Sequence, residues 1–296
     1  MYNEDLKYRY ISQLDKIYKP RAEALFERLQ SAENDADKDV GEMEKREVIN
    51  IIERYGICLY ISIRLPIWII NDYRRWYSEG SLERIDVREI DLSSEVKTHL
   101  FRDEDELSVA LMPMPIDQGY FIPPISYLLW LGLEIEEILN LKNSDVSEVE
   151  NGFCIRCGND ILVTSSKKIV SVLKEYINVK YIQRTYRSRY VAPDETVYFI
   201  KNYVVNKPKS PQERVEQGVV KKKFSLYNAK HPELTKNLTI TSISYSGKLF
   251  RMREAERAGV SFGKDYFRNV LHIPNERDYQ DMLLTFEAYK KAFPSN

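Results

Sequence analysis

Apolar residues in the first third of the 296-residue chain recur at the spacing of an α-helix. Over residues 5–29 they return about every 3.6 residues, and a second stretch of this kind covers residues 43–55. A third apolar stretch, residues 57–77, follows, and Pro66 is expected to kink or divide it. These patterns predict a compact bundle of about four helices.

The rest of the chain is predicted to combine helices with a small amount of β-structure. Residues 152–163 contain two short β-prone segments around Gly158 and Asn159, which form a turn dipeptide. Residues 207–239 are basic and polar, contain three prolines, and are expected to hold an exposed loop. Helical patterns recur in residues 168–179, 248–259, 262–271 and 277–293.

A change in composition marks the expected domain boundary. Residues 81–98 have few core-forming runs and alternate in charge, which is typical of a connector. We place the boundary near Ser93, with a linker at residues 93–98. The sequence therefore predicts two domains, residues 1–92 and 99–296, in a mainly α fold with a small β-hairpin or sheet.

The overall charge is almost balanced, but its distribution along the chain is not. The 44 basic and 45 acidic side chains give a net charge of −1. Residues 98–160 carry 3 basic and 12 acidic side chains, whereas residues 161–250 carry 17 basic and 6 acidic ones, a net charge of +11. A basic stretch of this size suits phosphate groups, and the alternative is a solvated basic face.

The cysteine content and the apolar segments indicate the cellular compartment in which such a chain would function. The three cysteines are an odd, low number, which is typical of a reducing compartment. Cys154 and Cys157 have CxxC spacing but lack the second ligand pair of a structural zinc site, so we expect neither a metal nor a cofactor. Arg64 and Pro66 interrupt the longest apolar stretch, and residues 1–10 lack a signal-peptide core. We therefore expect a cytoplasmic protein that does not associate with membranes.

Residues 131–146 read Leu-Gly-Leu-Glu-Ile-Glu-Glu-Ile-Leu-Asn-Leu-Lys-Asn-Ser-Asp-Val. This segment resembles the first signature box of the tyrosine recombinases, or phage integrases, whose pattern is Thr-Gly-Leu-Arg-Ile-Ser-Glu-Leu-Leu-x-Leu-x-Trp-Ser-Asp-Ile/Val. The flanks fit as well, since a helical domain precedes the box and a β-hairpin and a helix follow it. The resemblance implies an N-terminal core-binding-like domain and a C-terminal catalytic-like domain. The agreeing positions include Gly132, Leu133, Glu137, Leu139, Leu141, Ser144 and Asp145.

The resemblance fails at the positions that carry the chemistry. Family members have an arginine where this chain has Glu134, and a carboxylate there would repel the scissile phosphate. Glu134 could instead form a structural ion pair with a basic residue of the same pocket. The arginine of the second family box falls on Lys248 when counted back from Ala258, or on Ser244 when aligned on the Ser-Gly dipeptide. Lysine offers a point charge without the bidentate fork of arginine.

The other catalytic positions are equally degenerate. His272 could match the histidine of a later family box, although a lone histidine near a helix end is more often structural. The spacing between the family's boxes would place the nucleophilic tyrosine at Asp281. Tyr279 lies two residues before this position, and Tyr289 lies eight residues after it. Phosphoryl transfer to tyrosine needs several cations around one phosphate. The resemblance thus implies a recombinase fold without recombinase chemistry.

DNA binding does not require the catalytic arginines. The resemblance implies that duplex DNA is held between the two domains, and lysine and arginine side chains make most phosphate contacts. For Arg74 and Arg75 in the first domain, solvated surface charge is an equally good interpretation. The expected contacts are Lys180, Arg184, Arg187, Arg189, Lys221, Lys222 and Lys223 in the basic stretch, Arg74 and Arg75 in the first domain, and Lys248, Arg251 and Arg253 near the second box.

A DNA-binding protein that keeps this scaffold and loses its active site is suited to a regulatory role. The chain is similar in layout to the lysogeny repressors of SPβ-group phages, which look like inactive integrases. That resemblance implies a repressor of lytic genes, with double-stranded DNA and other phage regulatory proteins as partners. Two alternatives stay open: a divergent recombinase that uses Lys248, His272 and Tyr279, and an accessory recombination factor that binds DNA beside an active integrase.

Overall fold

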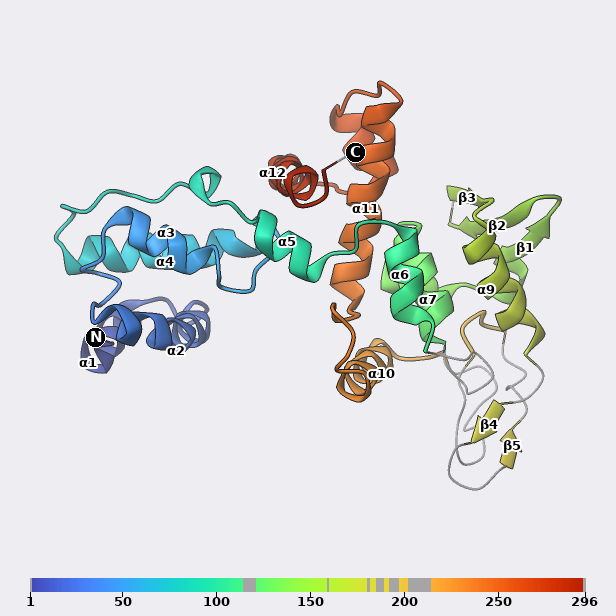
Figure 1. Cartoon of the computed structure of the whole chain (residues 1–296), viewed down its shortest axis with the longest axis horizontal. Helices are drawn as coiled ribbons and strands as arrows, with labels where there is room; N and C mark the ends of the chain where they lie inside the picture. Colours follow the sequence, from blue (N-terminus) through green and yellow to red (C-terminus); the bar gives the residue numbers. More distant parts are fainter. Residues whose placement is uncertain are drawn as a thin grey trace. The chain divides into compact units, whose positions relative to one another are not determined.

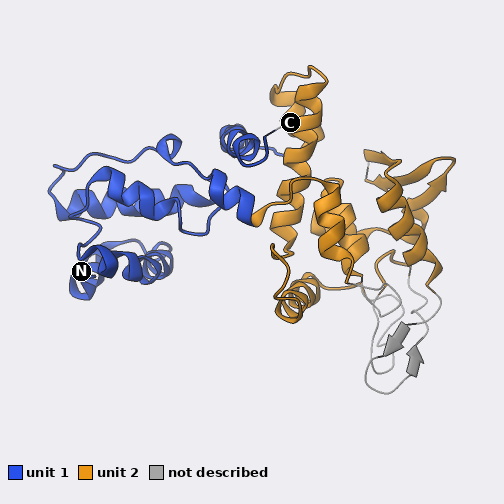
Figure 2. Ribbon diagram, viewed as in Figure 1, with its two compact units in different colours: residues 1–98, 273–296 blue, residues 99–272 orange. Residues whose placement is uncertain are grey.

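The computed structural model is mainly helical with a small sheet, which confirms the predicted fold class (Figure 1). It divides into two compact units (Figure 2). Unit 1 comprises Met1–Thr98 with Ile273–Asn296, and unit 2 comprises His99–His272. The structure describes residues 2–113, 121–158, 160–179, 182–184, 189–191, 197–201 and 214–294, without the side chains of 182–184 and 189–191.

Unit 1 is built from helices. They are α1 (Glu4–Gln13), α2 (Lys19–Ala36), α3 (Lys45–Ile52), α4 (Tyr60–Tyr77), α5 (Ser93–His99) and α12 (Glu276–Ala292). The apolar stripe at residues 5–29 is divided between α1 and α2, because Pro20 lies in the first turn of α2, where proline is favoured. Pro66 lies inside α4, which continues through it as one helix.

A buried ion network joins α1, α2 and α4 in unit 1. The Lys7 ammonium lies 2.7 Å from Oε1 of Glu33 and 2.8 Å from Oδ2 of Asp39. The Tyr73 hydroxyl donates a 2.9 Å hydrogen bond to the other oxygen of Asp39. Because each of these charged side chains is nearly inaccessible, the network depends on their mutual pairing.

Helix α12 packs against α4 and belongs to unit 1. The Nε of Arg64 donates to Oδ1 of Asp281 at 2.6 Å, and the Tyr60 N–H donates to Oγ1 of Thr285 at 3.3 Å. Met282, Phe286 and Tyr289 bury the apolar side of α12. The expected division placed this helix in a second domain, 99–296. The structure instead packs it within unit 1, and residues 93–98, expected as a linker, lie in α5.

Unit 2 surrounds a largely apolar core. Its three-stranded antiparallel sheet has the order β1-β2-β3, and the predicted strands at 152–163 are confirmed as β2 and β3. A separate hairpin pairs β4 with β5, with Arg184 opposite Arg189. The strands are β1 (Val146–Val149), β2 (Gly152–Cys157), β3 (Asp160–Thr164), β4 (Ile182–Arg184) and β5 (Arg189–Val191).

Two helices of unit 2 differ from the expectation. Helix α10 lies within the segment expected to hold a loop, because Val220, Phe224 and Tyr227 form a narrow apolar side that is buried. Helix α11 begins at Ile240, well before residue 248, because the hydroxyl of Thr239 caps its first turn. The helices are α6 (Glu104–Leu111), α7 (Ile122–Trp130), α8 (Ile135–Asn140), α9 (Lys167–Asn178), α10 (Gln217–Lys230) and α11 (Ile240–Arg257).

Helices α7 and α11 pack closely against each other and form the centre of unit 2. Every residue of α7 is buried. A Cβ built on Gly247 of α11 would lie 2.2 Å from the carbonyl oxygen of Trp130, so only glycine permits this approach. Within the described residues, no helix combines the length and apolar character needed to cross a membrane.

Candidate nucleic-acid interface

The turn between α7 and α8 places Glu134 at the surface of unit 2. Gly132 in this turn has a φ of +106°, a conformation that L side chains rarely adopt. Glu134 follows as the N-cap of α8, and its backbone N–H donates to Oε2 of Glu137 at 2.7 Å. The signature segment thus forms a tight corner that fixes the direction of the Glu134 side chain.

Lys248 of α11 faces this corner. Its Nζ lies 2.8 Å from Oε1 of Glu134, and the Lys248 side chain is only 8% exposed. The aromatic ring of Tyr245, one turn earlier, has its centroid 5.8 Å from the same ammonium. Glu134, at the first arginine position of the resemblance, therefore meets Lys248, which is one of the two candidates for the second, and the two side chains are a carboxylate and an ammonium. This is the structural ion pair that was one of the expectations for Glu134.

The ion pair changes what the corner can bind. Two arginines would present two positive charges and bidentate donors to a phosphate, whereas Glu134 and Lys248 together have no net charge. A phosphate oxygen placed beside Lys248 would also meet the Glu134 carboxylate, half of whose side chain is exposed. The geometry opposes the accumulation of negative charge that phosphoryl transfer involves.

Arg251 and Arg253, expected as phosphate contacts, point into unit 2. The Nη1 of Arg251 donates to the carbonyl oxygen of Trp130 at 2.5 Å, and burial lowers the pKa of this guanidinium to about 10. The Nη2 of Arg253 donates to the carbonyl oxygen of Arg102 at 3.1 Å. Because both guanidinium groups bind backbone carbonyls inside the unit, we correct their assignment from DNA contacts to structural residues.

The remaining candidate catalytic residues are dispersed. His272 is an exposed residue with a φ of +53°, at the end of unit 2. Tyr279 lies on α12 in unit 1 and is 5% exposed. Asp281, on which the family spacing of the nucleophile was expected to fall, is buried in its ion pair with Arg64. Lys248 and Tyr279 thus belong to different compact units.

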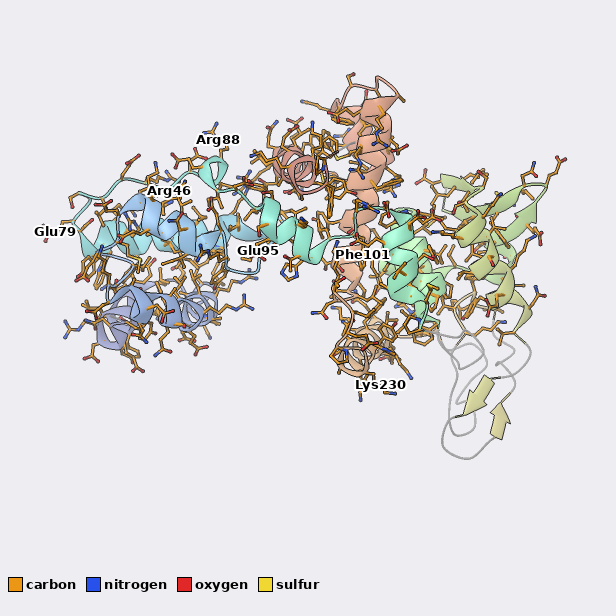
Figure 3. All side chains as sticks on the ribbon, viewed as in Figure 1. Arg46, Glu79, Arg88, Glu95, Phe101 and Lys230 are labelled. Carbon is orange, nitrogen blue, oxygen red and sulfur yellow. The ribbon has the colours of Figure 1, made fainter. Side chains whose placement is uncertain are left out.

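The three consecutive lysines of the basic stretch lie on α10. Lys221, Lys222 and Lys223 are all exposed, and the helix contains no acidic residue. Lys230 adds a further positive charge at the end of the helix (Figure 3). Within the part of the chain that the structure describes, no ion pair engages these three lysines. They give α10 an exposed basic segment.

Four other candidates from the basic stretch have no described side chains. Lys180 and Arg187 lie outside the described residues. Arg184 and Arg189 are described only as the backbone of the β4–β5 hairpin, in which they are paired. Their role in DNA binding stays a prediction.

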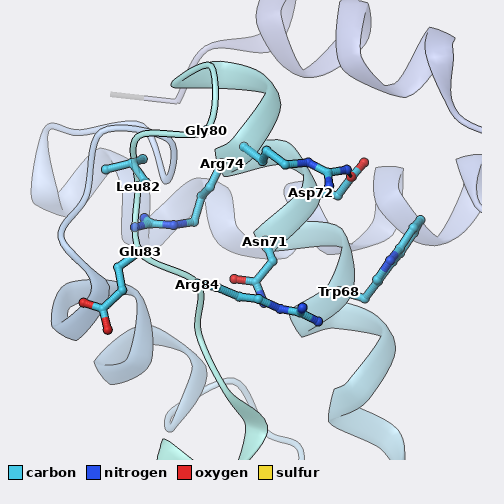
Figure 4. A pocket seen from close by; sticks show the side chains of 9 residues that line it. Trp68, Asn71, Asp72, Arg74, Gly80, Leu82, Glu83 and Arg84 are labelled. Atoms are coloured by element: carbon cyan, nitrogen blue, oxygen red, sulfur yellow. Dashed lines mark hydrogen bonds and ion pairs between the residues drawn. The ribbon is translucent and has the colours of Figure 1, made fainter.

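The two candidates in unit 1 have different environments. Arg74 is 2% exposed, and its Nη1 donates to the carbonyl oxygens of Val40 at 2.9 Å and Met43 at 2.7 Å. We correct its assignment, because a guanidinium held inside the helical bundle cannot reach DNA. Arg75 is exposed and pairs with Asp72. Arg74 and Arg84 line a small pocket of about 210 Å³ (Figure 4).

Two basic residues to which the sequence assigned no binding role have defined partners. Arg214 places Nη1 3.0 Å from Oε2 of Glu136 and 2.9 Å from Oδ1 of Asn140, both on α8. Arg64 holds Asp281, and its place inside an apolar helix was the signal that could have identified it. Among the described residues, no group of His, Cys, Asp or Glu side chains could hold a metal ion.

Comparison with known protein families identifies the N-terminal helices. Residues 1–79 match the family model of the MrpR N-terminal core-binding domain. These helices resemble an MrpR-type core-binding domain. The match ends just after α4, and it confirms the resemblance to the integrase-fold proteins for this part of the chain.

Comparison with curated proteins and with solved structures adds only general similarity. No curated protein matches the chain. The XerA recombinase is similar at 14% identity, with 99% of this chain and all of that chain covered and a TM-score of 0.42. The Tn1549 transposon integrase in complex with circular intermediate DNA is also similar at 14% identity, with 94% of each chain covered and a TM-score of 0.37.

Proposed function

We propose that the chain is a sequence-specific double-stranded DNA-binding protein that represses transcription, built on an integrase scaffold without recombinase chemistry. The observation that carries the proposal is the ion pair between Glu134 and Lys248. By the resemblance, an active recombinase needs a cation where this chain has the Glu134 carboxylate, and that carboxylate also engages the Lys248 ammonium.

Two features support DNA as the ligand. The MrpR-type core-binding domain at residues 1–79 belongs to a class of DNA-associated scaffold, and α10 presents three consecutive exposed lysines. The stretch 161–250 has a net charge of +11, so phosphate groups can replace solvent along it with release of counterions. Specificity would come from contacts with base edges beside these phosphate contacts.

The proposed regulatory role follows from binding to duplex DNA without cleavage of that DNA. A protein that occupies duplex sites and leaves them intact can exclude polymerase from a promoter. In the proposed setting, the lysogenic state of a phage within the bacterial cytoplasm, such occupancy would keep lytic genes silent. A role as an accessory recombination factor would use the same DNA contacts at attachment sites rather than at promoters.

The test combines site selection with a trap for covalent chemistry. The purified chain should select a small set of genomic duplex fragments, and these should lie at promoters. On a nicked suicide substrate containing a selected site, no covalent protein–DNA adduct should form, whereas an active recombinase tested in parallel should give one. An adduct that disappears in Tyr279→Phe would contradict the proposal in favour of the divergent recombinase. Selection of attachment sites alone would favour the accessory factor.

The basic stretch can be tested at the same site. Charge reversal at Arg187 or Arg189 should abolish the gel shift and leave the thermal unfolding midpoint nearly unchanged. Unchanged affinity in both variants would remove these residues from the proposed DNA face.

A further inference from the structure

A cavity of about 280 Å³ in unit 2 lies apart from the Glu134–Lys248 corner. It is formed where the start of β1 and the end of α9 meet residues 197–201. Its walls combine aromatic and aliphatic side chains with one amide and one ammonium. The lining residues are Asn143, Val146, Tyr176, Ile177, Phe199 and Lys201.

Backbone hydrogen bonds hold the walls of this cavity in place. The Asn143 N–H donates to the carbonyl oxygen of Val197 at 2.9 Å, and the Phe199 N–H donates to that of Leu141 at 2.8 Å. The Lys201 N–H donates to the hydroxyl oxygen of Tyr176 at 2.8 Å. The rings of Tyr176 and Phe199 also pack edge to face, with centroids 5.5 Å apart. The cavity is therefore formed before any ligand enters.

Lys201 gives the cavity its chemical character. Its ammonium lies 5.6 Å from the centroid of the Tyr176 ring, and no ion pair holds it within the described part of the chain. Burial lowers the pKa of this lysine, and no carboxylate of the described residues forms an ion pair with it. A half-buried ammonium without a counter-charge is unfavourable, and an anion in the cavity would remove this penalty.

We propose that this cavity binds a small apolar carboxylate, with the carboxylate on the Lys201 ammonium and the apolar body against Phe199, Val146 and Ile177. The volume is just below the range of about 300–1,000 Å³ of ligand pockets, which suits a compact ligand. Phosphate sites gather several donors or an arginine fork, whereas the lining of this cavity contributes one ammonium among largely apolar walls. Such a lining fits a monoanion with an apolar body.

This proposal does not depend on the DNA-binding function. The carboxylate could belong to a free small molecule or to the C-terminus of a peptide with an apolar last residue. Benzoate represents the first source, and N-acetylglycyl-phenylalanine with a free carboxyl group represents the second. Benzamide has nearly the shape of benzoate and no charge, so it serves as the control ligand.

The experiment is calorimetric titration of the full chain with each probe. Benzoate or the peptide should bind, and benzamide should bind about tenfold more weakly or not at all. Lys201→Met should lose this preference, whereas Lys167→Met, which changes an exposed lysine of α9, should keep it. Whichever of benzoate and the peptide binds more tightly identifies the source of the carboxylate.

A second measurement keeps the proposal testable if Lys201→Met does not fold. In protein labelled with ¹³C at the lysine ε-carbons, benzoate should raise the pKa of Lys201 in the wild-type chain. Equal binding of benzoate and benzamide, an unchanged Lys201 resonance at saturation, or the absence of binding by both carboxylates would overturn the proposal.

Discussion

The Nζ of Lys248 lies 2.8 Å from Oε1 of Glu134, which joins the N-cap of α8 to the middle of α11. The resemblance to the tyrosine recombinases assigns an arginine to the position of Glu134 and, on one of its two alignments, to that of Lys248. In this chain the two side chains form an ion pair, which holds the N-cap of α8 against the middle of α11 without a net charge.

Glu134→Ala should lower the free energy of unfolding by about 1–2 kcal/mol. The substitution leaves the nearly buried ammonium of Lys248 without its partner, whereas the partial exposure of Glu134 limits the cost. Urea denaturation at neutral pH measures the change. Glu148→Ala breaks the more exposed ion pair with Lys174 and should change the unfolding free energy by less than about 1 kcal/mol. Equal effects of the two substitutions would show that the Glu134 pair does not support the corner.

Local sequence patterns and the alignment of the signature segment made part of unit 2 predictable. The turn dipeptide at Gly158 correctly indicated β2 and β3, and the signature segment indicated the corner that carries Glu134. The pairing of Glu134 with a basic residue was one of the expectations from the sequence, because a carboxylate at this position of the signature segment called for a partner of opposite charge. Its partner became clear only from the packing of α11 on α7.

Long-range packing explains what the sequence could not show. The apolar side of α12 predicts a helix, but it does not say which unit buries it, and the Arg64–Asp281 pair joins residues 217 positions apart. The burial of Arg74 depends on carbonyl oxygens at Val40 and Met43, which a loop presents. Helix α10 was missed because the prolines and the basic, polar composition of residues 207–239 indicated a loop, although its three buried residues have helical spacing.

Gly132→Ala should destabilise unit 2 by about 1–3 kcal/mol. The residue has a φ of +106°, and a Cβ built there would lie 2.5 Å from Nη2 of Arg251, whose own position is set by Trp130. Thermal unfolding measures the change. Gly218→Ala is the matched control, because a Cβ there meets nothing within 4 Å and the residue lies in α10, so stability should be unchanged or raised. An unchanged thermal unfolding midpoint in Gly132→Ala would show that the turn between α7 and α8 can adjust to accommodate a Cβ.

Asp281→Ala should loosen α12 from α4. The substitution removes a carboxylate that is 2% exposed and bound by the Nε of Arg64, and it should cost about 1–2 kcal/mol because Arg64 can regain solvent. Limited proteolysis followed by mass spectrometry should show faster cleavage near residue 273. If cleavage there is as slow as in the unchanged chain, the apolar side of α12 suffices to hold the helix.

Asp86 should contribute to stability only above acidic pH. Hydrogen bonds from the side chain and backbone N–H of Arg88 lower the pKa of Asp86 to about 2 from an ordinary value of 3.8. Because the folded-state value is depressed, this contribution is present above about pH 4 and is lost as the pH falls towards 2. Asp86→Asn and Arg88→Gln should therefore weaken the acid dependence of the urea midpoint in this window, and to a similar extent. A wild-type acid profile in both variants would contradict the assignment.

The three exposed lysines of α10 should determine much of the salt dependence of DNA binding. Each neutralised phosphate contributes about −0.9 to the slope of log K against log salt concentration, so Lys221→Gln, Lys222→Gln and Lys223→Gln together should make the slope shallower by up to about 2.7. Because these side chains are exposed, the thermal unfolding midpoint should hardly change. Lys97→Gln, another exposed lysine, on α5, serves as a control for a change of charge away from α10. If the triple variant keeps the wild-type slope at a selected operator, α10 does not contact the phosphate backbone, and the DNA face must lie elsewhere in the basic stretch.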